Sequence, residues 1–384
     1  MRSSRPLLLY LVTEDWYFLS HRLPMACRAQ QAGYDVHVIT HLNGHGEAIK
    51  SHGFTLHPVT WRRGSLNPFA LLKTARQIRA LYRKINPDIV HHVALQPSIV
   101  GSLAAVGLPF PRINALAGLG FAFTSRSAKA RLLRVMLATS LRLLFRNPQT
   151  AILVQNPDDR GDMHALGVPD DRTVLIPGSG VDIHALAPLS EPEGEVTVAF
   201  VGRLLADKGV QTLIAAHQLA VSHGANIRLL IAGDGDPANP ASIPASEVER
   251  WKRLPQVEIL GHVKDIRGVW GRSHVAVLPS RREGLPKSLL EAAAYGRPIV
   301  ATDVPGCREI ARHNVNALLV PVDDPGPLAG ALTVLARDPA LRCRLGAAGR
   351  DIVENEFSSD RIGQEIVELY DRLVGRQAAL LPVP

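Results

Sequence analysis

Short apolar runs alternate with helical stretches along most of the chain, and this alternation is the feature that most restricts its fold. The runs expected to be strands cover residues 7–12, 35–40, 89–93, 112–116, 151–154, 173–176, 198–201, 227–232, 257–260, 274–278, 298–302 and 317–320. Helices are expected over residues 23–32, 68–85, 210–220, 286–295 and 360–374. Repeated strand-helix alternation indicates an α/β fold with doubly wound parallel sheets.

Turn-forming residues separate two such sheets. Residues 177–182 and 187–194 are rich in proline, glycine and serine and contain few apolar residues, which is typical of a linker. A chain of 384 residues is also longer than one core usually holds. We therefore predict an N-terminal domain over residues 1–187, a second domain over residues 188–360, and a terminal helical segment over residues 361–384.

The net charge of +8 lies entirely in the first half of the chain. Residues 1–190 contain 21 Lys or Arg against 11 Asp or Glu, whereas residues 191–384 contain 22 against 24. No acidic residue lies between Asp88 and Asp158. An excess of this kind suggests an anionic partner.

A basic amphipathic stretch over residues 125–145 lies within this region. Such a helix binds anionic lipid surfaces, although a core-facing helix with a solvated basic face is the alternative. The cations predicted to contact a membrane are Arg126, Lys129, Arg131, Arg134, Arg142 and Arg146.

Composition and spacing argue against several classes of protein. Cys27, Cys307 and Cys343 lie far apart without metal-binding spacing, so we expect a reduced, cytosolic protein. The apolar run at residues 6–12 is too short for a signal peptide, and no segment approaches ~20 uninterrupted apolar residues. The sequence disfavours a nucleic-acid binder, because few aromatic residues lie among the cations. It also disfavours a dinucleotide oxidoreductase, because neither half has the motif GxGxxG after a strand.

The segment Pro279 to Glu291 combines an expected strand end, a turn at Glu283-Gly284 and a helix in which Pro286 takes the first position. Amide groups and the dipole at a helix N-terminus favour an anion, so Lys287 and Ser288 are placed to bind phosphate. The carboxylates of Glu283 and Glu291 suit sugar hydroxyls. The pattern suggests a nucleotide sugar, and a plain loop with solvated carboxylates is the alternative.

A second junction of the same kind follows the run at residues 198–201. The loop Gly202 to Gly209 leads into a helix and contains Arg203 and Lys208, which together could neutralise a diphosphate. The loop at residues 234–244 is too rich in proline and glycine to be expected to be ordered.

These motifs closely resemble the retaining nucleotide-sugar glycosyltransferases of family 4, which have the GT-B fold. The resemblance rests on Gly202-Arg203 with Lys208-Gly209, Ala232-Gly-Asp-Gly235, Leu260-Gly261, Glu283-Gly-Leu-Pro-Lys-Ser-Leu-Leu-Glu291, and the tail Glu356-Phe-Ser-Ser359 with Leu369-Tyr370. It implies two Rossmann-like domains that face each other across a cleft, with the terminal helix crossing back onto the N-terminal domain.

The resemblance also implies roles. Arg203, Lys208 and Glu283 would be catalytic. The two cations would stabilise the diphosphate leaving group without a metal ion, and Glu283 would lie near the donor sugar and the diphosphate. Glu291 would accept from the ribose hydroxyls, and Leu260 with Gly261 would hold the base. The donor-binding set is Gly202, Leu260, Gly261, Gly284, Lys287, Ser288 and Glu291.

The N-terminal half resembles bacterial transferases that act on undecaprenyl-diphosphate-linked glycans in O-antigen, capsule or protein glycosylation. The residues that carry this are Phe18-Leu-Ser-His-Arg-Leu-Pro24, Gly33-Tyr-Asp-Val-His-Val38, Val90-His-His-Val93, Gly118-Leu-Gly-Phe-Ala-Phe-Thr-Ser125 and Pro177-Gly-Ser-Gly-Val-Asp182. One departure is that a histidine common in the family after the strand near Leu116 is absent here. The predicted acceptor-binding residues are His21, Arg22, His91, His92, Gly118 and Gly120, although buried neutral histidines and a tight glycine turn are the alternatives.

We therefore predict a cytoplasmic enzyme, peripheral on the inner membrane, that moves a sugar such as an N-acetylhexosamine from a UDP-sugar to a polyprenyl-diphosphate-linked saccharide. A GDP-sugar-dependent mannosyl- or fucosyltransferase and a non-catalytic partner in glycan assembly are the alternatives.

Overall fold

The computed structural model describes residues 5–61, 67–116, 149–237 and 239–376, together with residues 142, 145 and 147. The chain forms two compact units. The first unit comprises Met1–Ser179 and Ser359–Pro384, and the second comprises Gly180–Ser358. No helix among the described residues has the length and hydropathy needed to cross a membrane.

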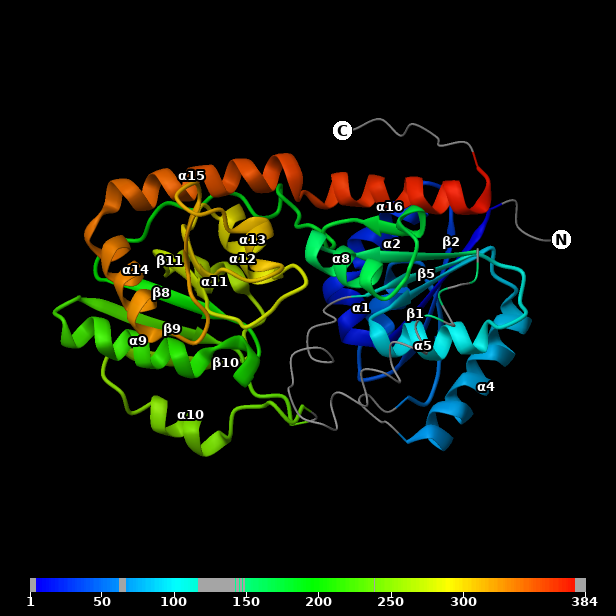
Figure 1. Ribbon diagram of the computed structural model, residues 1–384, viewed down its shortest axis with the longest axis horizontal. Coiled ribbons are helices and arrows are strands. Elements are labelled where there is room, and N and C mark those ends of the chain that lie inside the picture. Colours follow the sequence, from blue (N-terminus) through cyan, green and yellow to red (C-terminus); the bar gives the residue numbers. More distant parts are fainter. Residues whose placement is uncertain are drawn as a thin grey trace. The chain divides into compact units, whose positions relative to one another are not determined.

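The first unit is built on a seven-stranded parallel sheet in the order β3-β2-β1-β4-β5-β6-β7. Strands β1, β2 and β5 of this sheet are labelled in Figure 1. Its strands are β1 (Leu7–Glu14), β2 (Asp35–His41), β3 (Thr55–Pro58), β4 (Ile89–Val93), β5 (Arg112–Ala115), β6 (Thr150–Val154) and β7 (Thr173–Leu175). Its helices are α1 (Asp15–His21), α2 (Leu23–Gln31), α3 (Gly46–Ser51), α4 (Pro68–Ile85), α5 (Leu95–Ala104), α8 (Pro157–Ala165), the short η1 (Asp170–Arg172) and α16 (Ser359–Val374).

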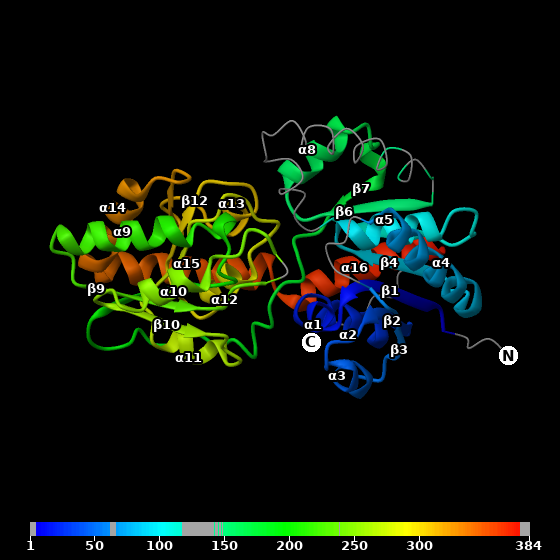
Figure 2. The same ribbon diagram turned by 90° about the horizontal axis from the view of Figure 1, so that it is seen from below.

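Both faces of this sheet are covered, which is why a central strand such as β1 is a nearly continuous apolar run rather than an alternation with polar residues. Successive residues of β1 point to opposite faces. Leu8 and Tyr10 pack with residues of α2 and α16, whereas Leu9 and Leu11 pack with residues of α4 and α5. Figures 1 and 2 show α16 lying beside α2 and α4 lying beside α5.

The second unit is built on a six-stranded parallel sheet in the order β10-β9-β8-β11-β12-β13. Its strands are β8 (Val196–Val201), β9 (Ile227–Ala232), β10 (Val257–Gly261), β11 (Val275–Leu278), β12 (Ile299–Thr302) and β13 (Ala317–Val320). Its helices are the short η2 (Ala206–Lys208), α9 (Val210–Ser222), α10 (Ala245–Trp251), α11 (Ile266–Gly271), α12 (Lys287–Ala294), α13 (Cys307–Ile310), α14 (Pro325–Arg337) and α15 (Pro339–Glu356). Helix α9 packs on α14, and α12 packs on α15 (Figure 2).

The predicted fold class, two doubly wound parallel α/β sheets, is confirmed. The first unit ends at Ser179 rather than at residue 187. The reason is that Val181 already belongs to the second unit, where its amide donates to the Phe357 carbonyl at 3.0 Å and its backbone pairs with Ser358. For the same reason the chain returns to the first unit at Ser359 rather than at residue 361.

Two local predictions are wrong. The sequence predicts no helix before residue 23, but residues Asp15–His21 form helix α1. Pro286 is the N-cap of α12 with φ of −75° and ψ of 108°, so Lys287 takes the first helical position. Extended backbone at Pro286 is consistent with an N-cap, which has non-helical dihedrals.

Candidate active site

The predicted donor residues of the second unit gather where its strand order reverses. Strands β8 and β11 are neighbours, and the chain proceeds from them toward opposite edges of the sheet. Loops that leave the carboxyl ends of such a pair diverge, and ligands of open α/β sheets bind there. Arg203 and Lys208 follow β8, and Glu283 follows β11.

An ion pair joins these two loops. Lys208 Nζ donates to Glu283 Oε1 at 2.5 Å, and the two side chains are 23% and 11% exposed. Ser280, which is fully buried, donates its hydroxyl to the same oxygen at 2.6 Å. Two donors from separate positions therefore hold the Glu283 carboxylate in one orientation.

Backbone packing brings the same loops together. Gly209 has φ of +70°, and a Cβ at this position would overlap the carbonyl of Pro279. The amide of Arg281 donates to the carbonyl of Asp207 at 2.9 Å. Glycine at position 209 is thus required both by its left-handed backbone and by the close approach of the β11 loop.

Arg203 is also paired inside the site. Its Nη1 donates to Asp236 Oδ2 at 2.7 Å, with the arginine side chain 45% exposed and the aspartate 12% exposed. Asp236 lies in the loop at residues 234–244, which was expected to lack order. The described part of that loop is held to the β8 loop by backbone bonds from Ala206 to Ala241 and from Ile243 to Leu204, at 2.8 and 2.9 Å.

Glu291 and Lys287 form the third ion pair of the region, with Nζ and Oε1 3.5 Å apart one turn along α12. Burial raises the pKa of the Glu291 carboxyl, and Lys287 opposes that rise. Ser288 lies beside them in the first turn of α12. Each of the three predicted cations at this edge therefore faces a carboxylate of the same unit.

The remaining donor-binding residues lie at the same edge of the sheet. The Gly202 amide donates to the Ala232 carbonyl at 3.0 Å, and the Gly261 carbonyl accepts from the Gly233 amide at 2.7 Å. Leu260 and Gly261 end β10, the edge strand, two strands away from β8. The Asp234 carboxylate accepts from the amide that follows Gly261, His262, at 3.0 Å.

Sequence reasoning missed three residues of this region. Asp236 and Ser280 each hold a predicted catalytic side chain, and the Thr302 hydroxyl donates to the Ser280 carbonyl. Asp236 is 33 positions from Arg203, and Thr302 is 22 positions from Ser280. No local pattern could have connected them, because the contacts depend on strands that are paired only in the fold.

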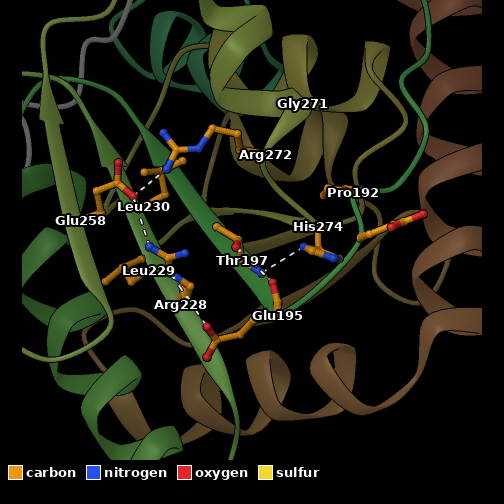
Figure 3. A pocket seen from close by; sticks show the side chains of 11 residues that line it. Pro192, Glu195, Thr197, Arg228, Leu229, Leu230, Glu258, Gly271, Arg272 and His274 are labelled. Atoms are coloured by element: carbon orange, nitrogen blue, oxygen red, sulfur yellow. Dashed lines mark hydrogen bonds and ion pairs between the residues drawn. The ribbon is translucent and has the colours of Figure 1, made fainter.

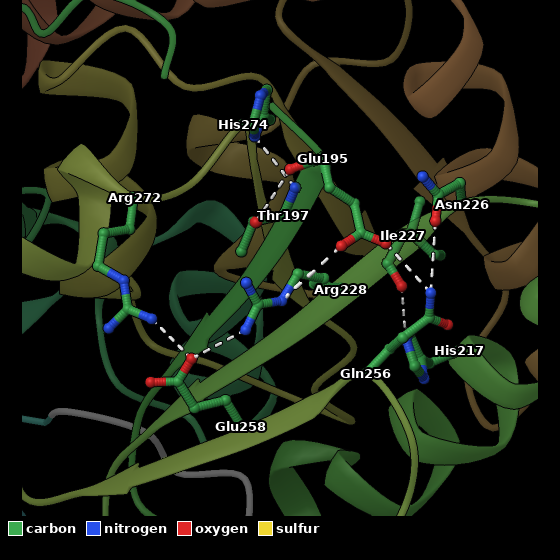
Figure 4. Close-up of polar contacts among 10 residues, drawn as sticks. All are labelled: Glu195, Thr197, His217, Asn226, Ile227, Arg228, Gln256, Glu258, Arg272 and His274. Atoms are coloured by element: carbon green, nitrogen blue, oxygen red, sulfur yellow. Dashed lines mark hydrogen bonds and ion pairs between the residues drawn. The ribbon is translucent and has the colours of Figure 1, made fainter. Parts of the chain in front are cut away.

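A cavity of about 240 Å³ opens at the opposite end of the same sheet (Figure 3). Its charged residues start or precede strands rather than follow them, and none is a predicted site residue. Figure 4 shows them paired with one another. Arg228 lies 4.0 Å from Glu195 and 3.5 Å from Glu258, and Arg272 lies 2.6 Å from Glu258.

His274 closes this cavity on one side. Its Nδ1 accepts from the Thr197 amide at 3.0 Å, so that nitrogen carries no proton. Burial lowers the pKa of His274. The two arginines of the cavity are thus paired with its glutamates, and the cavity lies away from the strand ends where an α/β sheet binds its ligand.

The acceptor residues predicted in the first unit occupy different environments. His21 ends α1, where its ring stacks on Tyr17 with centroids 4.3 Å apart and its Nδ1 lies 2.6 Å from the Ser20 hydroxyl. Arg22 is only 2% exposed and donates to the His21 carbonyl at 3.3 Å. The prediction that Arg22 binds the acceptor is not matched by an exposed guanidinium, because the turn between α1 and α2 folds this side chain inward.

His91 and His92 are fully buried on β4. His91 Nδ1 lies 2.7 Å from the Tyr370 hydroxyl. His92 lies 2.9 Å from the Tyr82 hydroxyl through Nε2 and 2.7 Å from Asn114 through Nδ1. The prediction that these two histidines contact an acceptor is corrected: burial lowers the pKa of both, as expected for neutral core histidines.

Several predicted residues fall outside the described part of the chain. These are Gly118, Gly120, Arg126, Lys129, Arg131, Arg134 and Arg146. Arg142 is described, and its Nε donates to the Leu166 carbonyl at 2.7 Å.

Two family models match different parts of the chain. A model described as "Glycosyl transferase 4-like" matches residues 8–156, and a model described as "Glycosyl transferases group 1" matches residues 195–338. The crystal structure of Alr3699/HepE from Anabaena in complex with UDP matches with a TM-score of 0.76 at 18% identity, covering 96% of this chain and all of the other. The fold is GT-B, and the protein is a glycosyltransferase.

Two relatives extend along nearly the whole chain. The capsular polysaccharide biosynthesis glycosyltransferase CapM of Staphylococcus aureus is 26% identical over 88% of this chain and 90% of its own. The N,N'-diacetylbacillosaminyl-diphospho-undecaprenol alpha-1,3-N-acetylgalactosaminyltransferase of Campylobacter jejuni is 26% identical over 93% of this chain and 98% of its own. The chain belongs to family 4 of the GT-B glycosyltransferases, among enzymes of bacterial glycan assembly, and the predicted family is confirmed.

Proposed function

We propose that this enzyme transfers an N-acetylhexosamine from a UDP-sugar to a polyprenyl-diphosphate-linked saccharide, with retention of anomeric configuration and without a metal ion. The observation that carries the donor part is the joining of the β8 and β11 loops by Lys208 and Glu283 at the switch point of the second unit. Cations and a helix N-terminus at such a junction suit a nucleoside diphosphate. The UDP bound to HepE and the acceptor and sugar in the name of the Campylobacter relative support the specific substrates.

The charge arrangement suggests how the leaving group is stabilised. Breaking the sugar-phosphate bond leaves negative charge on the diphosphate, and preorganised cations around it lower the barrier. Arg203 and Lys208 would supply that charge, together with the amides that begin α12. Asp236 and Glu283 each hold one of these cations at the strand ends, which limits the rearrangement that binding of a diphosphate would require.

The carboxylates have separate roles in this proposal. Glu291, whose side chain is 16% exposed, would accept hydrogen bonds from the ribose hydroxyls. Glu283, held by Lys208 and Ser280, would face the donor sugar and the diphosphate. An N-terminal unit that binds acceptor on the inner membrane completes the proposal.

The test begins with thermal stability in the presence of UDP, GDP, ADP or NAD. A nucleotide at a hundred times its dissociation constant stabilises a protein by about 2.7 kcal/mol, which is visible as a melting shift. We expect a shift with UDP that Glu291→Ala abolishes. A shift with GDP alone would replace the UDP-sugar by a GDP-sugar, and no shift with any nucleotide would contradict a donor site.

The reaction itself is tested with UDP-N-acetylhexosamines and a short-chain polyprenyl-diphosphate saccharide. Nuclear magnetic resonance of the product should show the anomeric configuration of the donor. Activity should persist in EDTA, and a complete loss that Mg²⁺ restores would contradict metal independence.

A further inference from the structure

The face of the first unit that α4 covers is strongly basic. Between Glu47 and Asp88 the sequence contains no acidic residue. Helix α4 falls in this interval and carries five cations: Lys73, Arg76, Arg79, Arg83 and Lys84. None of the five forms an ion pair with a carboxylate of the described residues. The neighbouring helix α5 has no charged residue, so nothing on it offsets this charge.

The same helix exposes large apolar side chains. Phe69 is 82% exposed, the highest value among the large apolar residues of the described chain, and Leu72 is 42% exposed. Asn67 caps the helix by accepting from the Phe69 amide at 3.0 Å, which places Phe69 in the first turn. Because the start of the helix is capped, fraying does not explain the exposure of this aromatic side chain.

The apolar and basic residues share one side of α4. The core side consists of Thr74, Ala75, Ile78 and Tyr82. Phe69, Leu72, Lys73, Arg76 and Arg83 recur at spacings of three, four and seven, which places them together on the opposite side. We call these five residues the α4 outer face. Cations on this side can attract anionic lipid, and the apolar side chains at its start can enter the headgroup region.

Helix α5 extends this surface. Arg79 donates to the carbonyls of Ala104 and Val106 at 2.8 and 2.6 Å, tying α4 to the turn after α5. Leu103 and Val106 in that region are 46% and 55% exposed. More apolar side chains thus lie beside the cations, and Figures 1 and 2 show α4 and α5 next to each other at the edge of this unit.

We propose that the α4 outer face docks on an anionic lipid bilayer, with Phe69 and Leu72 entering the headgroup region and the cations facing lipid phosphates. Charge complementarity selects this occupant, since five cations without a carboxylate repel one another until anions cover them. The proposal rests on the proposed function in one respect: a lipid-linked acceptor would make docking useful. In the sequence, α4 precedes the basic stretch at residues 125–145.

The test is sedimentation of the full chain with vesicles of phosphatidylcholine alone or mixed with phosphatidylglycerol. The wild type should bind the mixed vesicles and be released by high salt. We expect Lys73→Glu/Arg76→Glu/Arg83→Glu to weaken binding by at least about tenfold, because each well-placed cation contributes to attraction. Phe69→Ser/Leu72→Ser should weaken it severalfold at unchanged charge.

The matched control reverses three exposed cations of the second unit, Lys252→Glu/Arg253→Glu/Arg337→Glu, which gives the same net charge. It should bind vesicles within about twofold of the wild type, since these cations lie far from α4 in the sequence and outside its unit. Equal losses in the control and the α4 variant would overturn the proposal, as would no loss in the α4 variant. If the Phe69→Ser/Leu72→Ser variant binds vesicles as well as the wild type but is a monomer where the wild type is a dimer, the surface would be a contact between two copies of this chain and not a membrane contact.

The UDP melting shift of every variant separates this proposal from the donor assignment. Variants of α4 should keep that shift, which also shows that they fold. A wild type that binds anionic vesicles but shows no shift with any nucleotide would defeat the proposed function and leave the docking surface standing.

Discussion

The two units use the same plan of parallel strands and covering helices, but they place their polar residues in opposite environments. In the second unit, Arg203, Lys208 and Glu283 are partly exposed at strand ends and paired with one another or with Asp236. In the first unit, the polar residues of β4, His91 and His92, are fully buried. The comparison teaches that a polar residue near a strand end can contact a ligand only where its side chain is exposed. A buried polar residue at such a position bonds to other core residues instead.

The buried polar residues of the first unit form a network that stabilises the fold. The Tyr370 hydroxyl on α16 lies 2.7 Å from His91 Nδ1 and 2.7 Å from the Tyr10 hydroxyl on β1. Tyr34 donates to Asp371 on the same helix at 2.8 Å. These bonds join α16 to strands that are more than 270 positions away in the sequence.

The largest effect on activity is expected from substitution of Lys208 in the second unit. Lys208→Met should lower kcat by about 10²- to 10³-fold, because it removes positive charge where the leaving diphosphate becomes negative. The control is Lys252→Met, an exposed lysine paired with Glu249 in the same unit, which should keep wild-type kcat. Steady-state rates with saturating donor measure both, and a Lys208→Met enzyme with wild-type kcat would refute the assignment.

The next largest effects are expected from substitution of one glycine in each unit. Gly209→Ala should abolish the UDP melting shift, because its Cβ would overlap the Pro279 carbonyl and push the two site loops apart. In the first unit, Gly101→Ala would overlap the ring of buried His92. We expect it to destabilise the protein by about 1–3 kcal/mol, as overpacked cores do, with the UDP dissociation constant unchanged. Urea unfolding and nucleotide titration distinguish the two, and a loss of UDP binding in Gly101→Ala would contradict the separation.

Buried titratable groups should give the two units opposite pH responses. Burial lowers the pKa of His92 to about 4, so its contribution is complete above pH ~6.5 and is lost as the pH falls toward 4. The loss should amount to about 3 kcal/mol. Burial raises the pKa of Glu291, so its contribution is complete below its ordinary pKa and is lost as the pH rises.

Thermal melts of wild type, His92→Gln and Glu291→Gln from pH 4.5 to 8 measure these responses. His92→Gln should melt with a shallower acid dependence than the wild type. Glu291→Gln should gain stability relative to the wild type as the pH increases. Parallel curves for all three proteins would show that neither group titrates across folding.

The smallest effect is expected at Asp236. The Arg203 side chain is 45% exposed, and pairs of this kind contribute about 0–1 kcal/mol. Asp236→Asn removes a carboxylate that competes with phosphate for Arg203, so UDP should bind up to about fivefold more tightly at low salt. Titration at low and high salt measures this, and weaker binding at both would indicate that Asp236 orients Arg203 instead.

Much of the fold could be predicted from local patterns. The expected runs at residues 89–93, 227–232 and 317–320 coincide with β4, β9 and β13. The capped helix from Asn67 to Asn86 is present, with Asn86 in the left-handed conformation that ends helices. Such signals act within a few residues, so no tertiary contact is needed to recognise them. Strand β3 was not predicted, because Thr55–Pro58 is short and half-polar.

Of the candidate donor site, the sequence predicted only the residues that belong to motifs. Glycines, cations and carboxylates at strand ends indicated the donor edge of the second unit, because strand direction alone places loops at one edge. The same reasoning failed for His91, His92 and Arg22, since a polar residue near a strand end can point to the core as well as to solvent.

The sequence by itself determined the alternation of strands and helices, the family, and which residue types stand at the strand ends. Tertiary structure decided which of those residues meet. Lys208 pairs with Glu283 across 75 positions, and Tyr370 reaches His91 across 279. The physical reason is that local patterns encode backbone conformation within a few residues, whereas burial and ion pairing depend on which distant strands become neighbours in the sheet.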